Sequence, residues 1–461
     1  MVAHNRDERS IGLSTATAVV AANMIGTGVF TSLGFQLLSL ETGFAILALW
    51  LVGGLAALCG ALSYGELSGA MPRSGGEYYL LSRVYHPAVG FLSGWVSVVV
   101  GFSAPIAAAA MAMGQYLTRV LVQTGVVAAD SQSLTVTVVG ITGVTLVSIV
   151  HLFDIKIVSR FQVAFTTLKV SLIVMLIVSG FALATAQPVS FLPSRAAVDS
   201  VFTPAFAASL VYVMYAYSGW NAAIYVASDV KQPGRYLPLS LAFGTLLVVL
   251  LYAPLNAVFL YAAPIDQLKG QVDVGYIAAS HIFGSTGGLI MGLLISTGLV
   301  SAISSMVWAG PRVTQVMGED VRLLRALSVR NANGVPHVSL GFQYLLVVGL
   351  ILTSTFDAIV NYIGFILSFS AFLTVTGVFV LRITQPELPR PYRVWGYPIT
   401  PLVFLAVTGW MMFFVVRQRP MVLLAGAVTL AAGVVVYFIN RAVSPTPSSG
   451  PTAPTAPAPR R

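Results

Sequence analysis

Two apolar stretches of the sequence are interrupted by small residues in a way that could create a binding site for a charged solute. The interruptions are Asn23-Met24-Ile25-Gly26-Thr27-Gly28-Val29-Phe30 and Tyr215-Ala216-Tyr217-Ser218-Gly219-Trp220-Asn221. In lipid every backbone N–H and C=O group must be paired, so unwound backbone persists only where it lines a cavity or is buried in protein. Freed N–H groups at a helix start can bind an anion, and freed carbonyls can bind a cation. The alternative for either break alone is that its small residues only allow close helix packing.

Lys169 is a third candidate, because it lies inside an apolar stretch. It is the only Lys or Arg that we place within a membrane span. If its helix starts near Ile157, Lys169 lies about 18 Å from the helix end at about 1.5 Å per residue, which is too far for its ammonium to reach the interface. A buried lysine is unfavourable unless it is paired, so this residue is a functional candidate. The alternative is a pore-facing lysine with a structural role only.

Composition identifies the elements that must position these residues as membrane helices. The chain has 461 residues, of which 57% are hydrophobic and 8% charged, whereas soluble domains carry about 25% charged residues. Apolar runs of roughly 20 residues, long enough to cross a bilayer, recur about twelve times. They lie near 11–36, 43–70, 87–120, 133–152, 157–185, 202–228, 237–262, 285–316, 337–355, 358–382, 397–416 and 421–440.

Charge distribution predicts the orientation of these spans. With the N-terminus in the cytoplasm and spans that alternate in direction, most of the 24 Lys and Arg residues fall on the inner side. Those on the outer side are Arg119, Arg195, Lys269, Arg417 and Arg419. Because positive residues favour the cytoplasmic side, we expect a multi-pass protein of the inner (plasma) membrane with both termini in the cytoplasm. The net charge of +9 follows from this bias, so no nucleic-acid partner is expected.

The two interruptions divide the chain into two halves. Each half holds five spans, over about 11–185 and 202–382, so the second is expected to be inverted relative to the first and the site to lie near the midplane. Residues 397–440 would add two helices to this ten-helix core at 11–382. Residues 1–10 are expected to be a cytoplasmic N-terminus. Residues 441–461, rich in Pro, Ala and Thr, are expected to be a disordered cytoplasmic tail.

Other function classes lack the residues they need. The single cysteine, Cys59, lies within an apolar run, so neither an intramolecular disulfide nor a Cys-based metal site is expected, and the five histidines have no ligand spacing. We find no phosphate-binding Gly-rich loop, ATPase domain or catalytic triad. We therefore expect no enzyme, no cofactor and no metal. A sensor or scaffold would need a folded soluble output domain, and the chain lacks one.

Four segments together resemble the amino acid–polyamine–organocation (APC) superfamily of transporters, and most of all its bacterial amino acid permease and L-amino-acid-transporter-like branches. They are Asn23 to Phe30, Met71-Pro-Arg-Ser-Gly-Gly-Glu-Tyr78, Tyr215 to Asn221 with Asp229 and Pro233, and Gly310-Pro-Arg312. The resemblance covers roughly Ile11 to Arg382. It implies an all-α membrane protein with a LeuT-like fold, in which a 5+5 inverted repeat has broken helices 1 and 6 and is followed by two extra helices.

The resemblance also implies roles for the interrupted segments. An amino acid carboxylate would bind the N–H groups of Gly26, Thr27 and Gly28, and its ammonium would bind carbonyls of Met24, Tyr215 and Ser218. Ile25, Ala216 and Gly219 complete the predicted substrate site, and Tyr215, Trp220 and Asn221 are the predicted gate. The alternative for the two aromatic residues is ordinary helix packing.

Lys169 also has a counterpart in the family. Sodium-coupled relatives hold Na⁺ between span 1 carbonyls and span 8 hydroxyls, whereas sodium-independent members place a span 5 lysine there. Ser301, Ser304 and Ser305 of span 8 are its expected partners. Glu66 is expected to join loop arginines in a cytoplasmic gate. Relatives that pair with a glycoprotein carry a cysteine between spans 3 and 4, and since Val122–Ser133 has none, no disulfide-linked subunit is expected.

These observations predict a secondary amino acid transporter. Sodium-independent exchange or uptake of neutral L-amino acids by alternating access is the favoured form. The alternatives are a proton-coupled amino acid symporter, or a carrier of cationic amino acids or polyamines. A cationic substrate would need a carboxylate within the spans, and peripheral Glu66 is the one candidate there.

Overall fold

The secondary structure is helical throughout the part of the chain described by the computed structural model, residues 11–153 and 156–443. Segment 1–10 and most of the expected tail at 441–461 lie outside the described residues. No β-strand forms within the described ranges, where an isolated bridge joins Ile11 and Val230. The helices are α1 (Leu13–Met24), α2 (Gly28–Gln36), α3 (Gly43–Ala70), α4 (Gly76–Val84), α5 (Pro87–Val96), η2 (Ser97–Gly101), α6 (Ser103–Gln123), η3 (Ala129–Ser131), α7 (Gln132–His151), α8 (Lys156–Leu183), α9 (Arg195–Val201), α10 (Pro204–Tyr217), η4 (Trp220–Asp229), α11 (Pro233–Ala262), α12 (Ile265–Leu268), α13 (Val274–Asp320), η5 (Arg322–Ser328), α14 (His337–Thr353), α15 (Phe356–Thr384), α16 (Ile399–Gln418) and α17 (Pro420–Val443).

The membrane-spanning helices lie where the sequence predicts apolar runs, but fewer of them are long enough to cross a membrane. Ten helices of the described chain are long and apolar enough to cross a membrane, or up to 11 if α9 is taken with the bent segment α10–η4 as one span. The expected ninth run forms the shorter apolar helix α14 (His337–Thr353). It has 17 residues, and a helix needs about 20 to cross the hydrocarbon core at right angles, so the expected twelve spans include one short helix.

Both predicted interruptions are present as breaks in helices. In the first, α1 ends at Met24 and α2 begins at Gly28. In the second, α10 ends at Tyr217 and the 3₁₀ segment η4 begins at Trp220. Gly219 has φ 95°, a conformation that L residues rarely adopt. An added Cβ there would also lie 2.7 Å from the Asn23 amide nitrogen, so the second break depends on glycine.

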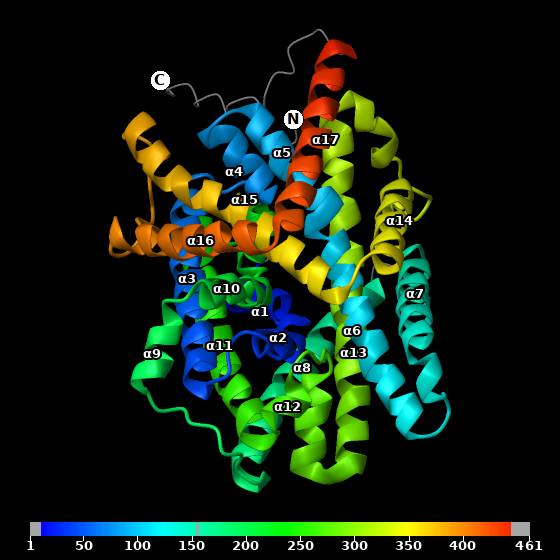
Figure 1. Cartoon of the computed structure of the whole chain (residues 1–461). Coiled ribbons are helices and arrows are strands. Elements are labelled where there is room, and N and C mark those ends of the chain that lie inside the picture. The colour runs from blue at the N-terminus through cyan, green and yellow to red at the C-terminus, as the bar shows by residue number, and fades with distance from the viewer. Residues whose placement is uncertain (1–10, 154–155, 444–461) are drawn as a thin grey trace, which may run out of the picture.

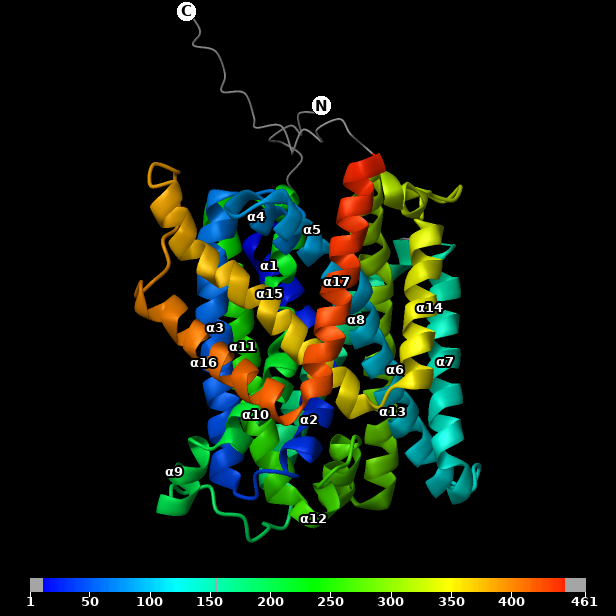
Figure 2. The ribbon, with the colours of Figure 1, turned by 45° about the horizontal axis from the view of Figure 1, so that its top comes forward.

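The broken helices lie at the centre of the bundle (Figure 1). There α1 packs against α11 and η4, whereas α2 packs against α10 and α13. Helices α7 and α14 pack together on the outer side of α6, and α16 crosses α3 and α10. Figure 2 shows α4 at one end of the bundle and α9 and α12 at the other. We call these the α4 end and the α12 end.

Candidate functional site

At the first break some backbone groups are already hydrogen-bonded, and others are left without a partner. The Met24 carbonyl accepts hydrogen bonds from the Gly26 N–H (2.9 Å) and from the Tyr252 hydroxyl (2.8 Å). The Ile25 carbonyl accepts one from Lys169 Nζ at 2.7 Å. A carbonyl oxygen has two lone pairs, so the Met24 carbonyl is filled. Of the N–H groups predicted to bind a carboxylate, that of Gly26 is therefore occupied. Those of Thr27 and Gly28 have no partner among the described hydrogen bonds and remain suited to an anion.

The second break also leaves selected groups open. The Tyr215 carbonyl accepts bonds from the Ser218 N–H (3.0 Å) and the Ser218 hydroxyl (2.7 Å). The Gly219 carbonyl accepts bonds from Ala222 N–H and the Asn23 amide. Among the described hydrogen bonds, none ends on the Ser218 carbonyl. Of the three carbonyls expected to hold an ammonium group, Ser218's is therefore the one with its lone pairs available.

The two breaks are linked by side chains. The Thr27 hydroxyl and the Tyr215 hydroxyl lie 2.5 Å apart, and both residues are at least nine-tenths buried. Gly28 lies against Ala216, because an added Cβ would come within 2.4 Å of the Ala216 Cα. The close-packing role considered for these small residues therefore holds for Gly28, which faces α10 directly.

A cavity of about 120 Å³ lies between the breaks. A single water needs roughly 10–15 Å³ of such space, so several waters or a small solute would fit. The two breaks contribute Asn23, Met24, Gly26, Thr27, Gly28, Tyr215, Ala216, Tyr217, Ser218, Gly219, Trp220 and Asn221. Ile25, which the sequence analysis placed in the substrate site, is not among the lining residues. The rest of the lining includes Ser97, Gly101, Phe102, Ala302, Met306, Leu367, Ser368, Glu77 and Tyr225. We call this space the central cavity.

The predicted gate residues have different surroundings. Tyr215 lines the central cavity beside Thr27. The Trp220 ring is tilted against the rings of Tyr64 and Phe404, with centroids 5.8 and 5.4 Å away, so it packs against α3 and α16. The Asn221 amide donates to Glu77 Oε1 at 3.0 Å. Packing, the alternative considered for the two aromatic residues, thus describes Trp220 better than Tyr215.

Lys169 reaches the first break from α8. Its side chain is 4% exposed, and its stem passes Gly298 of α13, where an added Cβ would lie 3.2 Å from Lys169 Cγ. None of the described hydrogen bonds joins Lys169 to the three serines that were expected to be its partners. The Ser304 hydroxyl pairs with His151 Nε2 at 2.8 Å, and the Ser305 hydroxyl donates to the Ser301 carbonyl at 2.9 Å. The structure therefore brings Lys169 to span 1, while its described hydrogen bond does not involve span 8.

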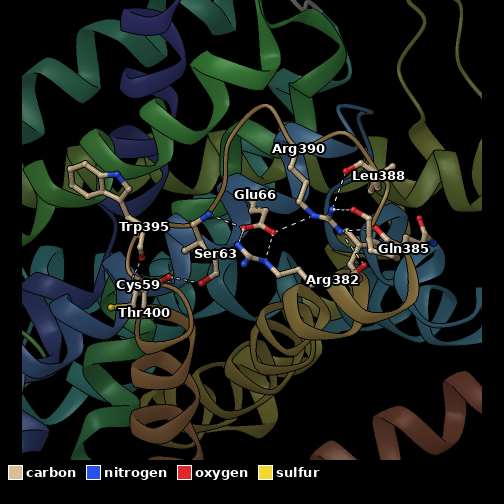
Figure 3. Close-up of polar contacts among 12 residues, drawn as sticks. Cys59, Ser63, Glu66, Arg382, Gln385, Leu388, Arg390, Trp395 and Thr400 are labelled. Atoms are coloured by element: carbon tan, nitrogen blue, oxygen red, sulfur yellow. Dashed lines mark hydrogen bonds and ion pairs between the residues drawn. The ribbon is translucent and has the colours of Figure 1, made fainter.

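Glu66 pairs with arginines at the α4 end, as the sequence predicted (Figure 3). Arg382 donates to both carboxylate oxygens, at 2.9 and 2.6 Å, and Arg390 Nε lies 3.5 Å from Oε1. The backbone N–H of Val394 adds a bond of 2.7 Å. Arg390 also donates to the carbonyls of Leu381, Gln385, Pro386 and Leu388. This cluster fastens the α15–α16 connection to α3.

Two parts of the cavity wall were missed by the sequence analysis. One is η2 (Ser97–Gly101), a π-helical turn beside the cavity. Pro105 follows it and has no N–H to donate to the carbonyl four residues earlier, which explains a local change of helix type. The other is Glu77, which lies on α4 between spans and so escaped a search for carboxylates within spans.

The fold and the cavity define a membrane transporter, and comparisons with known proteins agree. Residues 11–452 match the amino acid permease family, and the chain belongs to that family. It is 26% identical over 443 residues to the large neutral amino acids transporter small subunit 2 of Oryctolagus cuniculus, covering 94% of this chain and 80% of the relative. It is 24% identical over 443 residues to the b(0,+)-type amino acid transporter 1 of Rattus norvegicus, covering 94% and 88%. This chain is therefore a multi-pass amino acid transporter of the APC superfamily rather than an enzyme, and the family implies the LeuT-like fold.

Proposed function

We propose that the chain carries neutral L-amino acids across the membrane by alternating access, without sodium, as an exchanger or an uptake carrier. The observation that carries this proposal is the pair of breaks around the central cavity. The α2 start offers N–H groups for a carboxylate, and the Ser218 carbonyl offers an acceptor for an ammonium group. An amino acid zwitterion needs one of each.

The position of Lys169 supports sodium independence. Its ammonium lies 2.7 Å from the Ile25 carbonyl, so a positive charge already occupies the span 1 side of the place where sodium-coupled relatives hold Na⁺. A second cation beside it would be repelled in this low-dielectric setting. Ser301, Ser304 and Ser305 of α13 stay candidates for contacts with Lys169 in another state of the cycle.

A neutral substrate is favoured over a cationic one. Among the described residues, the one carboxylate that lines the central cavity is that of Glu77, and three neutral groups already donate to its oxygens. The name of the Oryctolagus relative refers to large neutral amino acids, which supports the same choice. A carrier of cationic amino acids or polyamines is the second candidate. Such a substrate needs a carboxylate for its additional positive charge, and Glu77 supplies a carboxylate at the cavity wall.

We also propose that the two halves, about 11–185 and 202–382, are inverted repeats. The contacts support this: α1 packs against η4, and α2 packs against α10, so the first part of each broken helix faces the second part of the other. Placement in an inner (plasma) membrane with both termini cytoplasmic rests on the charge bias of the sequence. No disulfide-linked subunit is proposed, because Cys59 is buried within α3.

The test is transport by the purified chain in proteoliposomes. A panel of radiolabelled amino acids is offered while internal amino acid, pH and sodium are varied independently. We expect neutral L-amino acids to be taken up at the same rate in sodium and in choline, and faster with amino acid inside. Strong sodium dependence would contradict the role given to Lys169, and preferential uptake of cationic amino acids would favour the second candidate.

A further inference from the structure

Glu77 is a buried carboxyl group at the α4 end of the central cavity. Its side chain lines the cavity, and the residue is 6% exposed. Oε1 accepts hydrogen bonds from the Tyr64 hydroxyl at 2.5 Å and from the Asn221 amide at 3.0 Å. Oε2 pairs with the Ser370 hydroxyl. One side chain thus joins α4 to α3, to η4 behind the second break, and to α15.

No positive group within the described residues pairs with Glu77. The titratable groups that face it are Tyr64 from α3 and Tyr225 from η4, and the groups from α15 and α5 are the serines Ser370 and Ser93. The nearby charged residues are engaged elsewhere or exposed: Arg73 over the Tyr79 ring, Glu66 with Arg382, Asp320 with the Tyr78 hydroxyl, and Arg83 at the surface.

An unpaired carboxylate in such surroundings is unfavourable. Burial raises the pKa of Glu77 above that of an ordinary glutamic acid, and the hydrogen bonds from Ser370, Tyr64 and Asn221 oppose this only in part. The neutral acid is therefore present at higher pH than for an exposed glutamate. The geometry around the two oxygens shows how such an acid would be accommodated.

The two oxygens differ in the partners they have. Oε1 receives two donors, one of them an amide N–H that cannot accept. Oε2 faces a hydroxyl, which can either donate or accept, and Ser370 Oγ lies 3.3 Å from Ser93 Oγ, where either atom can donate. If a proton binds at Oε2, Glu77 donates to Ser370 and Ser370 donates to Ser93. Glu77 and Ser370 thus keep a hydrogen bond to each other in both protonation states without a change of position.

We propose that Glu77 is a proton-binding site of the transport pathway, with Ser370 as the hydroxyl that reverses its hydrogen bond when the proton binds or leaves. The consequence follows from solvation. While the α4 end of the cavity is closed, the site favours the neutral acid, since an unpaired buried charge is costly. When that end opens to water, the carboxylate is solvated and the proton leaves more readily. Opening and deprotonation are thereby linked.

The transport readout of this inference depends on the proposed function, and the test uses the whole chain in proteoliposomes. Exchange of a neutral amino acid is measured from about pH 5 to about pH 8, with equal pH on both sides. The wild type should change its rate by roughly threefold or more, with a midpoint above about 4.3, the ordinary value for glutamic acid. Exchange by Glu77→Gln should be independent of pH, because a carboxamide does not ionise in this range, accepts from Tyr64 and Asn221 and donates to Ser370.

Two further variants separate titration from structure. Glu387→Gln, at an exposed loop residue, should keep the wild-type pH profile. Ser370→Ala should move the midpoint to higher pH, because the carboxylate loses a donor that stabilises it. A Glu77→Gln protein that folds and retains the wild-type pH profile would overturn the proposal, and so would a Ser370→Ala midpoint that does not move.

A measurement made without substrate tests the proton site independently of amino acid transport. Infrared titration of the purified protein should show a band of a protonated carboxyl group that disappears as pH rises. The band should be missing in Glu77→Gln and present in Glu387→Gln. If transport of amino acids fails but this band behaves as stated, the proton site stands while the proposed function falls. A band that persists in Glu77→Gln would exclude Glu77 as its source.

Discussion

Gly26 and Gly28 lie on either side of Thr27 but face different surroundings. An added Cβ at Gly26 would meet its nearest atom, the Met24 carbonyl oxygen, at 4.0 Å, and Gly26 lines the central cavity. We predict that Gly26→Val folds normally and lowers amino acid uptake by at least about tenfold, equivalent to about 1.4 kcal/mol of lost binding. The valine side chain would occupy space beside the α2 start that a carboxylate needs. Uptake in proteoliposomes and thermal unfolding are the measurements.

Gly28→Val is expected to behave differently from Gly26→Val. Its side chain would press on the Ala216 backbone, and overpacking of this kind costs about 1–3 kcal/mol, so this variant should lose stability as well as transport. Gly349→Val is the matched control, because Gly349 is exposed on α14 with open space around it. Normal uptake by Gly26→Val would remove the first break from the substrate site.

Lys169 should matter for the rate of the transport cycle. We predict that Lys169→Met lowers the exchange rate by about tenfold or more, while amino acid affinity changes less. Methionine keeps the stem beside Gly298 but cannot donate to the Ile25 carbonyl, and a buried acceptor left without its partner costs about 1–3 kcal/mol. That is enough to shift the ratio of two conformations by roughly tenfold. Exchange and equilibrium binding are compared on the same preparation.

The control for Lys169 is a lysine with ordinary surroundings. Lys269 is partly exposed and lies 3.3 Å from Glu41, which is 76% exposed, so Lys269→Met should transport like the wild type. If Lys169→Met also exchanged at the wild-type rate, the buried lysine would have a structural role only.

At the scale of elements, the breaks were predictable and the cavity wall was only partly so. Gly26, Gly28 and Gly219 stand out in apolar runs, because a glycine there signals unwound backbone or close approach. Glu77 gives no such signal, since α4 is a short amphipathic helix between spans and nothing in its sequence shows that it turns toward the cavity. The availability of carbonyls was also unpredictable. Whether Met24 or Ser218 has a free lone pair depends on partners as distant as Tyr252.

The Glu66 cluster shows how one element is fastened to another, and it supports a prediction about stability. Glu66 and Arg390 are 1% and 5% exposed. We predict that Glu66→Ala destabilises the protein by about 3–5 kcal/mol, because it leaves a buried arginine without its carboxylate. Thermal unfolding in detergent is the measurement, with Glu41→Ala as the control. The Glu41–Lys269 pair is exposed, and such pairs contribute about 0–1 kcal/mol. Equal unfolding temperatures for the two variants would contradict the anchoring role.

At the scale of the whole molecule, the distribution of Lys and Arg residues predicts the orientation in the membrane. The fold provides sites at which this orientation can be tested. The chain has a single cysteine, buried Cys59, so Cys59→Ala gives a background without thiols. Ala128 and Ala332 are both exposed, the first between α6 and α7 and the second between η5 and α14. These two connections lie at opposite ends of the bundle (Figure 2). They therefore form a matched pair of alanine-to-cysteine sites.

We predict that a membrane-impermeant maleimide labels Ala128→Cys in intact cells, and labels Ala332→Cys only after the membrane is permeabilised. The reason is electrostatic. The α4 end carries Arg73, Arg83, Arg322, Arg325 and Arg330 in its connections, and arginines close to span ends are retained on the cytoplasmic side. Labelling of Ala332→Cys in intact cells would reverse the orientation. The end of the cavity that Glu77 occupies would then open to the outside rather than to the cytoplasm.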